Sequence, residues 1–263
     1  MPETNTNVFW GVPGALAVNA NATLLCVGDS WFWYPLDNLA VEIAAARPNH
    51  TVVVVGTNGA ESAQWSESYR KDIDYAFRFY GKDVLALLLS GGGNDVAGMK
   101  DFLRLLEDDC SDAPTVQQCY RSGQPDAIIS KIMGAYREVI HRFRARNRTA
   151  PVLMHNYDNA WPTGQGLFGP SKWLKKPMDT ARVPEPLRRP LFKDLVAKLH
   201  DGQQALSQEP ALGPLVAIQT AGTLPEPAQG PQQWWANELH PTPAGFRRLV
   251  AQKFLPEIDR LTR

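Results

Sequence analysis

Four residues along the chain carry the groups that acyl transfer needs. Ser30 offers a hydroxyl, Asn94 a side-chain amide and His240 an imidazole that is a base near neutral pH. Gly59 offers an N–H that a substrate can approach closely, because no Cβ stands in the way. Acyl transfer requires a nucleophile, a base that takes its proton, and donors aimed at the oxyanion. We therefore predict Ser30 as nucleophile, His240 as base, and an oxyanion hole made by the N–H groups of Ser30 and Gly59 and the amide of Asn94.

The position of Ser30 in the sequence favours this role. Residues 24–27 form an apolar run typical of a buried strand, and residues 28–30 (Gly-Asp-Ser) form the turn that ends it. Residues 35–46 have a helical pattern, so Ser30 is expected near a helix N-terminus. Free N–H groups at such a terminus favour a developing negative charge.

Five apolar runs alternate with helical patterns along the chain. The predicted strands are 24–27, 51–56, 84–89, 151–154 and 215–218, and the predicted helices are 35–46, 69–79, 126–146, 190–208 and 243–261. Runs rich in Val, Ile and Leu are typical of parallel strands that are covered on both faces. The alternation predicts an α/β protein with a doubly wound parallel sheet of about five strands. Ligands bind such a sheet beyond the carboxyl ends of its strands, where Ser30, Gly59 and Asn94 fall.

Two long connections leave strand ends at this predicted active edge. Residues 97–124 contain an acidic patch and two cysteines, and residues 156–190 are rich in Gly, Pro and Trp. Long connections at such an edge are commonly lids or substrate walls. We therefore expect a single domain over residues 1–263 with two lid-like insertions, the second of which supplies an apolar pocket wall. His155, after the fourth strand, is a further candidate for a pocket role.

The composition is that of an ordinary globular protein with a formal net charge of zero. Nothing in this balance indicates a nucleic acid or an anionic membrane as a partner. No apolar run approaches the ~20 residues of a membrane-spanning helix, and residues 1–21 lack the pattern of a signal peptide, so we expect a cytoplasmic protein. Cys26, Cys110 and Cys119 do not have the spacing of a zinc site. We expect no metal, and free thiols at all three positions.

The order of these blocks resembles that of the SGNH (GDSL) hydrolase family. The resemblance rests on residues 28–30 (Gly-Asp-Ser), Gly59, residues 93–95 (Gly-Asn-Asp) and residues 240–241 (His-Pro). It covers the chain from about residue 22 to 255. Members of the family are esterases, lipases, acyl-ester hydrolases and carbohydrate esterases on a flavodoxin-like three-layer α/β/α fold.

The resemblance implies the same site residues. It implies Ser30 as nucleophile, His240 as base, and Ser30, Gly59 and Asn94 as the oxyanion hole, with neither a metal nor an organic cofactor. Gly56 is a rival to Gly59 as the glycine of this site.

One position departs from the family pattern. The family places Asp three residues before the histidine, whereas this chain has Asn237. An asparagine orients an imidazole by accepting its hydrogen bond, but it does not stabilise the imidazolium by charge. Glu238 and Asp158 are alternative acids, and a Ser–His dyad is a third arrangement. We expect Asn237 to orient His240 and the activity to be measurable but modest.

Two classes of function fit these residues. The first is an esterase- or lipase-type serine hydrolase that cleaves a small-molecule, lipid or carbohydrate ester through an acyl-enzyme on Ser30. The second is a catalytically impaired domain that binds an ester or a carbohydrate, an interpretation favoured by Asn237; an acyltransferase using the same site is a further alternative. A nucleotide-binding protein is disfavoured, because the chain has neither a G-x-G-x-x-G pattern after a strand nor a P-loop lysine. The acyl chain, the alcohol and the oligomeric state are left open.

Overall fold

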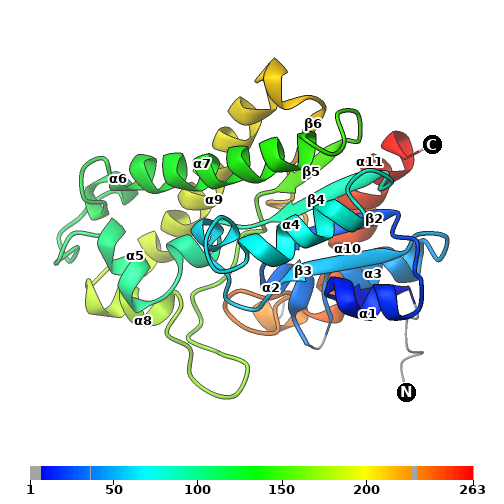
Figure 1. Ribbon diagram of the computed structural model, residues 1–263. Coiled ribbons are helices and arrows are strands. Elements are labelled where there is room, and N and C mark those ends of the chain that lie inside the picture. Colours follow the sequence, from blue (N-terminus) through cyan, green and yellow to red (C-terminus); the bar gives the residue numbers. More distant parts are fainter. Residues whose placement is uncertain (1–6, 36, 227–229, 263) are drawn as a thin grey trace.

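A single parallel sheet organises the part of the chain that the computed structural model describes, residues 7–35, 37–226 and 230–262 (Figure 1). Within these residues the sheet has six strands in the order β1-β3-β2-β4-β5-β6, and all neighbours run parallel. The strands are β1 Val8–Trp10, β2 Leu24–Gly28, β3 Val52–Gly56, β4 Ala86–Ser90, β5 Val152–His155 and β6 Leu215–Ile218.

Helices connect the strands and cover both faces of the sheet. The α-helices are α1 Val12–Ala17, α2 Ser30–Trp33, α3 Leu39–Ala46, α4 Arg70–Phe79, α5 Met99–Leu105, α6 Val116–Cys119, α7 Gln124–Arg144, α8 Lys175–Thr180, α9 Glu185–Ser207, α10 Pro243–Leu249 and α11 Leu255–Leu261. The shorter helical turns are η1 Ser62–Trp65, η2 Asn94–Val96, η3 Pro210–Leu212, η4 Pro231–Gln233 and the π-helical turn η5 Val250–Phe254. Helices α1, α4, α7 and α9 contact one another in that order, whereas α3 packs with α10 and η5. The result is the predicted three-layer α/β/α arrangement.

The five predicted strands are confirmed as β2 to β6, and their order is that of flavodoxin-like folds. The sheet has one strand more than we predicted, because β1 pairs with β3 at the edge of the sheet. This strand is three residues long, and its last residue, Trp10, is 39% exposed. A segment this short does not show the alternation or the long apolar run by which strands are recognised.

The predicted helix over residues 35–46 was wrong at its start. Ser30 begins the separate single turn α2, and α3 begins only at Leu39. The side chain of Asn38 accepts a hydrogen bond from the Val41 N–H at 3.0 Å, which caps α3 at this point. The predicted start of the helix over residues 190–208 was also wrong, but in the other direction: α9 begins earlier, at Glu185, and contains Pro190 within it. Ser30 therefore lies in the first turn of its own helix rather than before a longer one.

Two glycines bring the carboxyl ends of three strands close together. Gly28 of β2 pairs with Gly56 of β3 on one side and with Ser90 of β4 on the other. A Cβ on Gly56 would overlap the carbonyl oxygen of Gly28, and a Cβ on Gly28 would overlap that of Ser90. Gly56 also has a φ of +136°, in a region that side chains disfavour. This glycine therefore serves the packing of the strands, in contrast to Gly59, whose Cβ would meet nothing within 4 Å.

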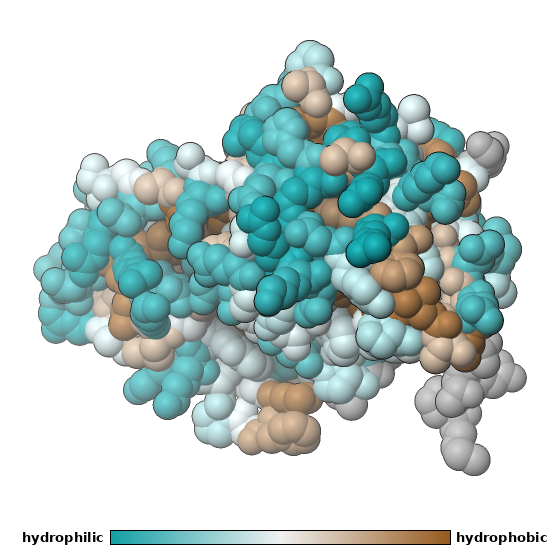
Figure 2. All heavy atoms as spheres, in the orientation of Figure 1, coloured by the Kyte–Doolittle hydropathy of each residue, from teal (hydrophilic) through white to brown (hydrophobic). Residues whose placement is uncertain are grey.

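The two long connections form separate structures at the edge of the sheet. Residues 97–124 contain α5 and α6, and residues 156–190 contain a projecting loop, α8 and the start of α9. The loop extends at the bottom of Figure 1, and Figure 2 shows hydrophobic side chains at its tip, where Phe168 is 95% exposed. Cys26, Cys110 and Cys119 are free and buried. None of the described helices is both long and apolar enough to cross a membrane.

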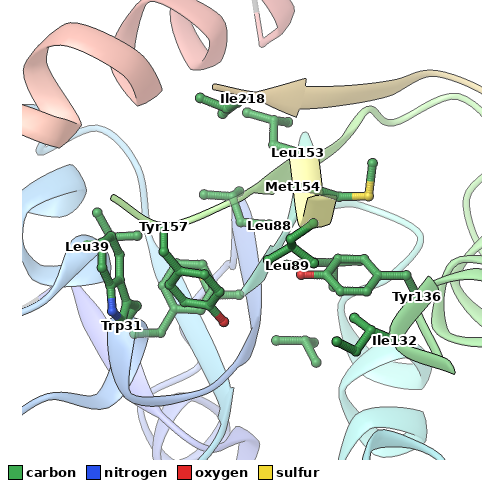
Figure 3. Close-up of a cluster of buried hydrophobic side chains, with 14 of the residues drawn as sticks. Trp31, Leu39, Leu88, Leu89, Ile132, Tyr136, Leu153, Met154, Tyr157 and Ile218 are labelled. Carbon is green, nitrogen blue, oxygen red and sulfur yellow. The ribbon is translucent and has the colours of Figure 1, made fainter. Parts of the chain in front are cut away.

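The end of β5 carries a histidine that is fully buried in the core. The His155 ring lies among the aromatic rings of Trp31, Phe32, Tyr157 and Phe254, with centroids 4.9–6.4 Å away. Figure 3 shows Trp31 and Tyr157 of this group side by side. The Nδ1 of His155 accepts from the Tyr157 N–H at 3.2 Å, and its Nε2 is without a hydrogen-bond partner among the described residues. Burial lowers the pKa of His155 to about 3.

This burial predicts an acid-sensitive core. In the unfolded chain, His155 takes up a proton below its ordinary pKa of about 6.5, whereas in the folded protein it stays neutral down to about pH 3. The free energy of unfolding therefore falls as the pH drops from about 6.5 towards 3. Between pH 7 and pH 4.5, wild type should lose about 2 kcal/mol more stability than His155→Phe. Urea unfolding at both pH values measures the difference. The exposed His141 provides the control, since His141→Gln should behave as wild type; an unchanged pH slope in His155→Phe would contradict the prediction.

The strand contacts give a second prediction. Gly56→Ala should lower the free energy of unfolding by about 3 kcal/mol or more, because the new Cβ overlaps the backbone of Gly28 and the positive φ is strained. Gly59→Ala, with open space around it and a φ of +77°, should cost only about 1–2 kcal/mol. Chemical denaturation of the two variants compares them, and equal losses would show that strand approach is not the reason for Gly56.

Candidate active site

A serine and a histidine far apart in the sequence meet at the carboxyl edge of the sheet. The Nε2 of His240 lies 2.7 Å from the Oγ of Ser30. Ser30 is the first residue of α2, which follows β2, and His240 stands just before α10. Both side chains are buried, with 8% and 6% of the residue exposed. The geometry is that of a hydroxyl held against a base.

Asn237 orients the imidazole from its other side. Its Oδ1 accepts hydrogen bonds from the Nδ1 of His240 at 3.0 Å, from the His240 N–H at 2.9 Å and from the Leu239 N–H at 2.9 Å. Its Nδ2 donates to the hydroxyl of Tyr34 at 3.0 Å. Two backbone donors fix which end of the amide is the oxygen, so Nδ1 of the neutral imidazole carries the proton. The Nε2 lone pair is then free to face Ser30.

The imidazole lies in an apolar environment. The ring of Tyr34 stacks on it with centroids 4.2 Å apart, and Trp173 of the second insertion approaches edge-on at 5.9 Å. Burial lowers the pKa of His240 to about 3, because the charged form loses its contact with water. The neutral, proton-accepting form therefore prevails at neutral pH.

Glu238 does not face the histidine. Its carboxylate is fully buried and accepts hydrogen bonds from the second insertion: from the N–H groups of Gly164 at 2.7 Å, Leu174 at 3.1 Å and Lys175 at 2.8 Å, and from the hydroxyl of Ser171. Glu238 thus fastens this insertion to the loop that carries the histidine. Of the alternative partners for the base, it is the neighbouring Asn237 that reaches the imidazole.

Asp158 is likewise engaged elsewhere. Its carboxylate accepts from the N–H groups of Asn159 and Gly222, both at 2.6 Å, and of Leu224 at 2.7 Å. These contacts tie the start of the second insertion to the segment after β6. Asp158 therefore does not contact the imidazole.

A further buried carboxylate, that of Asp29, connects the ends of three strands. It accepts from the Trp31 N–H at 3.0 Å, from the hydroxyl of Ser90 at 2.8 Å and from the hydroxyl of Tyr157 at 2.6 Å. The amide of Asn94 lies at the limit of hydrogen bonding, 3.4 Å away. Burial raises the pKa of Asp29 to about 6, although these hydrogen bonds oppose the shift.

The proposed oxyanion donors lie on three adjacent loops. The Asp29 cap uses the Trp31 N–H and leaves that of Ser30 at the front of α2. The Nδ2 of Asn94 donates to the carbonyl of Ala60 at 3.0 Å, which ties it to the loop that contains Gly59. Ser30 and Asn94 line one pocket, whereas Gly59 is not among its lining residues.

The pocket beside Ser30 is small and largely apolar. It contains about 320 Å³ of empty space that is open to solvent. The lining residues are Asp29, Ser30, Trp31, Gly93, Asn94, Tyr157, Asp158, Ala160, Phe192 and Leu239. A larger groove at the β1 side of the sheet contains none of Ser30, Asn94 and His240. Among the described residues no group of three or more His, Cys, Asp or Glu side chains is arranged to hold a metal ion.

Several residues of the site were not singled out from the sequence. Tyr34 touches the imidazole and Tyr157 the Asp29 carboxylate, but each is one aromatic residue among many. Trp173 is different, since it is one of the aromatic residues by which the second insertion was expected to supply a pocket wall, and it lies edge-on against the imidazole. Tyr157 has a φ of +64°, which a sequence does not reveal. The only feature of the sequence that could have pointed to Tyr34 was the aromatic run of residues 31–34, immediately after Ser30. His155, a candidate for the pocket, is instead part of the core.

Known proteins relate to this chain by family and by fold. The family model described as the GDSL-like Lipase/Acylhydrolase family matches residues 26–248. No curated protein sequence matches. Similar solved structures include phospholipase A1 from Streptomyces albidoflavus NA297 (TM-score 0.53, 14% identity, 92% of this chain and 100% of that chain). Another is a carbohydrate esterase family 3 protein from Talaromyces cellulolyticus (TM-score 0.51, 14% identity, 92% and 98%).

A third similar structure is an acetyl esterase mutant with acetate ion (TM-score 0.50, 14% identity, 92% and 98%). At this identity the structural neighbours establish a shared fold, the same parallel sheet flanked by helices. The sequence match covers most of the chain, including Ser30, Asn94 and His240. The chain belongs to the GDSL-like lipase/acylhydrolase family of ester hydrolases.

Proposed function

We propose that the protein cleaves carboxylic esters through an acyl-enzyme on Ser30, with His240 as the base. The observation that carries this proposal is the distance of 2.7 Å between Ser30 Oγ and His240 Nε2, with Asn237 Oδ1 at the opposite ring nitrogen. A hydroxyl held by a base that a third group orients is the arrangement of activated serine nucleophiles.

In the first half of the reaction, Ser30 Oγ attacks the carbonyl carbon of the ester. His240 Nε2 takes the hydroxyl proton as the new C–O bond forms. The negative charge moves to the former carbonyl oxygen, where the N–H groups of Ser30 and Gly59 and the amide of Asn94 stabilise it. The intermediate collapses when the bond to the alcohol breaks. His240 returns its proton to the alcohol oxygen, which leaves Ser30 acylated.

In the second half, water takes the place of the alcohol. His240 removes a proton from water, the hydroxide attacks the acyl carbon, and the same donors stabilise the second oxyanion. The bond to Ser30 breaks, Ser30 regains its proton from His240, and the carboxylic acid leaves. An alcohol in place of water would give acyl transfer on the same residues.

The size of the pocket favours a short acyl group. Its walls near Ser30 come from Trp31, Tyr157, Ala160, Phe192 and Leu239, and the cavity that they enclose holds only about 20 Å³, well below the volume of most small-molecule sites. Each methylene of a long chain that stays in water forgoes about 0.8 kcal/mol of burial. We therefore propose acetyl and similarly short esters as the substrate class.

The alternative of binding without turnover is favoured by a single feature, the neutral Asn237. In a serine protease, replacement of the triad carboxylate by Asn lowers kcat about 10⁴-fold, chiefly through the wrong tautomer of the histidine. Here the amide oxygen holds Nδ1–H and leaves Nε2 facing Ser30, so the tautomer is the productive one. This geometry favours catalysis.

The test of the proposed function is a series of nitrophenyl esters combined with covalent labelling. We expect kcat/KM to be highest for the acetate and to fall at least about tenfold towards the octanoate, because the pocket does not receive the longer chain. Ser30→Ala should abolish turnover, while Ser122→Ala, at an exposed serine, should not. A fluorophosphonate probe should modify the peptide that contains Ser30. Turnover that survives Ser30→Ala would refute the proposal.

The oxyanion assignment gives a quantitative expectation. Asn94→Ala should lower kcat by about 10²–10³ with little change in KM, since the amide stabilises charge that develops only in the transition state. Steady-state kinetics on the acetate ester measure this. Asn49→Ala, at an exposed asparagine far along the chain from the site, is the matched control. A loss of only a few-fold in folded Asn94→Ala would remove this residue from the oxyanion hole.

A further inference from the structure

The phenol ring of Tyr34 lies face to face with the imidazole of His240. The ring centroids are 4.2 Å apart and the planes are inclined by only 7°. Both residues are buried, with 4% and 6% of their surface exposed, so little water reaches the contact between the two rings. The face of an aromatic ring carries negative electrostatic potential and attracts a cation placed over it.

Main-chain and side-chain hydrogen bonds hold Tyr34 in this position. Its N–H donates to the carbonyl of Ser30 at 2.6 Å, and its own carbonyl accepts from the amide of Asn38 at 3.1 Å. Its hydroxyl accepts from the Nδ2 of Asn237 at 3.0 Å. The ring is therefore fixed relative to both the nucleophile and the residue that orients the base.

Within residues 7–35, 37–226 and 230–262, no carboxylate is hydrogen-bonded to the imidazole on which the positive charge forms. Asp29 is held by Trp31, Ser90 and Tyr157, and Glu238 by the second insertion. The oxygen of an amide carries only a partial charge, so the imidazolium needs a further source of stabilisation.

We propose that the π face of Tyr34 stabilises the imidazolium of His240, in the role that a carboxylate has where a triad contains one. The inference rests on the proposed function, because the imidazolium forms when His240 takes the proton of Ser30. A cation over a desolvated aromatic face gains enough to change a rate by about 2- to 30-fold. Tyr34 is thus a positioning and charge-stabilising partner of the base rather than a group that reacts.

Progressive fluorination of the ring tests this idea at almost constant shape. Fluorine withdraws electron density from the face, so cation binding weakens with each atom while packing is nearly preserved. The series is Tyr34→Phe followed by its mono-, di- and trifluorinated forms, all of which lack the hydroxyl. The readout is the rate at which a fluorophosphonate modifies Ser30, a step in which the Ser–O–P bond forms, fluoride leaves and His240 takes the proton.

We expect the labelling rate to fall stepwise along the series, by about three- to tenfold in total. The same series at Phe77, a buried ring that packs against Phe143, should leave the labelling rate unchanged. If the labelling rate stays constant along the series at position 34, in variants with unchanged unfolding midpoints, Tyr34 does not have the proposed role. Labelling of Ser30 in the same experiment would still support the proposed function. If Ser30 in wild type is not labelled at all, both the proposed function and this inference fail.

Discussion

The arrangement of the site depends on one buried anion, the carboxylate of Asp29. Such a group has no donors of its own and must receive hydrogen bonds, since a buried charge without partners is strongly disfavoured. Its donors come from α2, β4 and the end of β5, so satisfying Asp29 sets the spacing of these elements. Ser30 follows Asp29 directly. The position of this proposed nucleophile therefore depends on the hydrogen bonds of Asp29 and on the close contact of Gly28, Gly56 and Ser90.

The neutral Asn237 is consistent with this electrostatic setting. Asp29 and Glu238 are already buried within a few residues of Ser30 and His240 along the chain. A carboxylate at position 237 would add like charge near these groups and would carry its own loss of hydration. An amide keeps the geometric function, because its oxygen still receives the Nδ1 proton and two backbone donors. In the proposed reaction, the side chains of Ser30, His240 and Asn237 are therefore neutral before the substrate reacts.

The sequence predicted what depends on local pattern and missed what depends on packing. Residues 24–28 and their counterparts in β3 to β6 are apolar runs with clear ends, so the strands and the polar groups after them were predictable. The pairing of Ser30 with His240 followed from the order of the family blocks. The three-residue β1, the stack on Tyr34 and the direction of Glu238 were not predictable, because each depends on which surfaces meet after folding. Neighbours in sequence point in different directions here: Asn237 reaches the imidazole, whereas Glu238 faces the insertion.

The hydrogen bonds of Glu238 have a mechanical consequence for substrate entry. A hinged flap over an active site must swing without disturbing the catalytic groups. If the second insertion swung in this way, it would pull on the buried carboxylate of Glu238, which is one residue from Asn237. The hydrogen bonds that this carboxylate accepts from Gly164, Leu174 and Lys175 would break together. The second insertion is therefore held in place by the same short segment that carries Asn237 and His240.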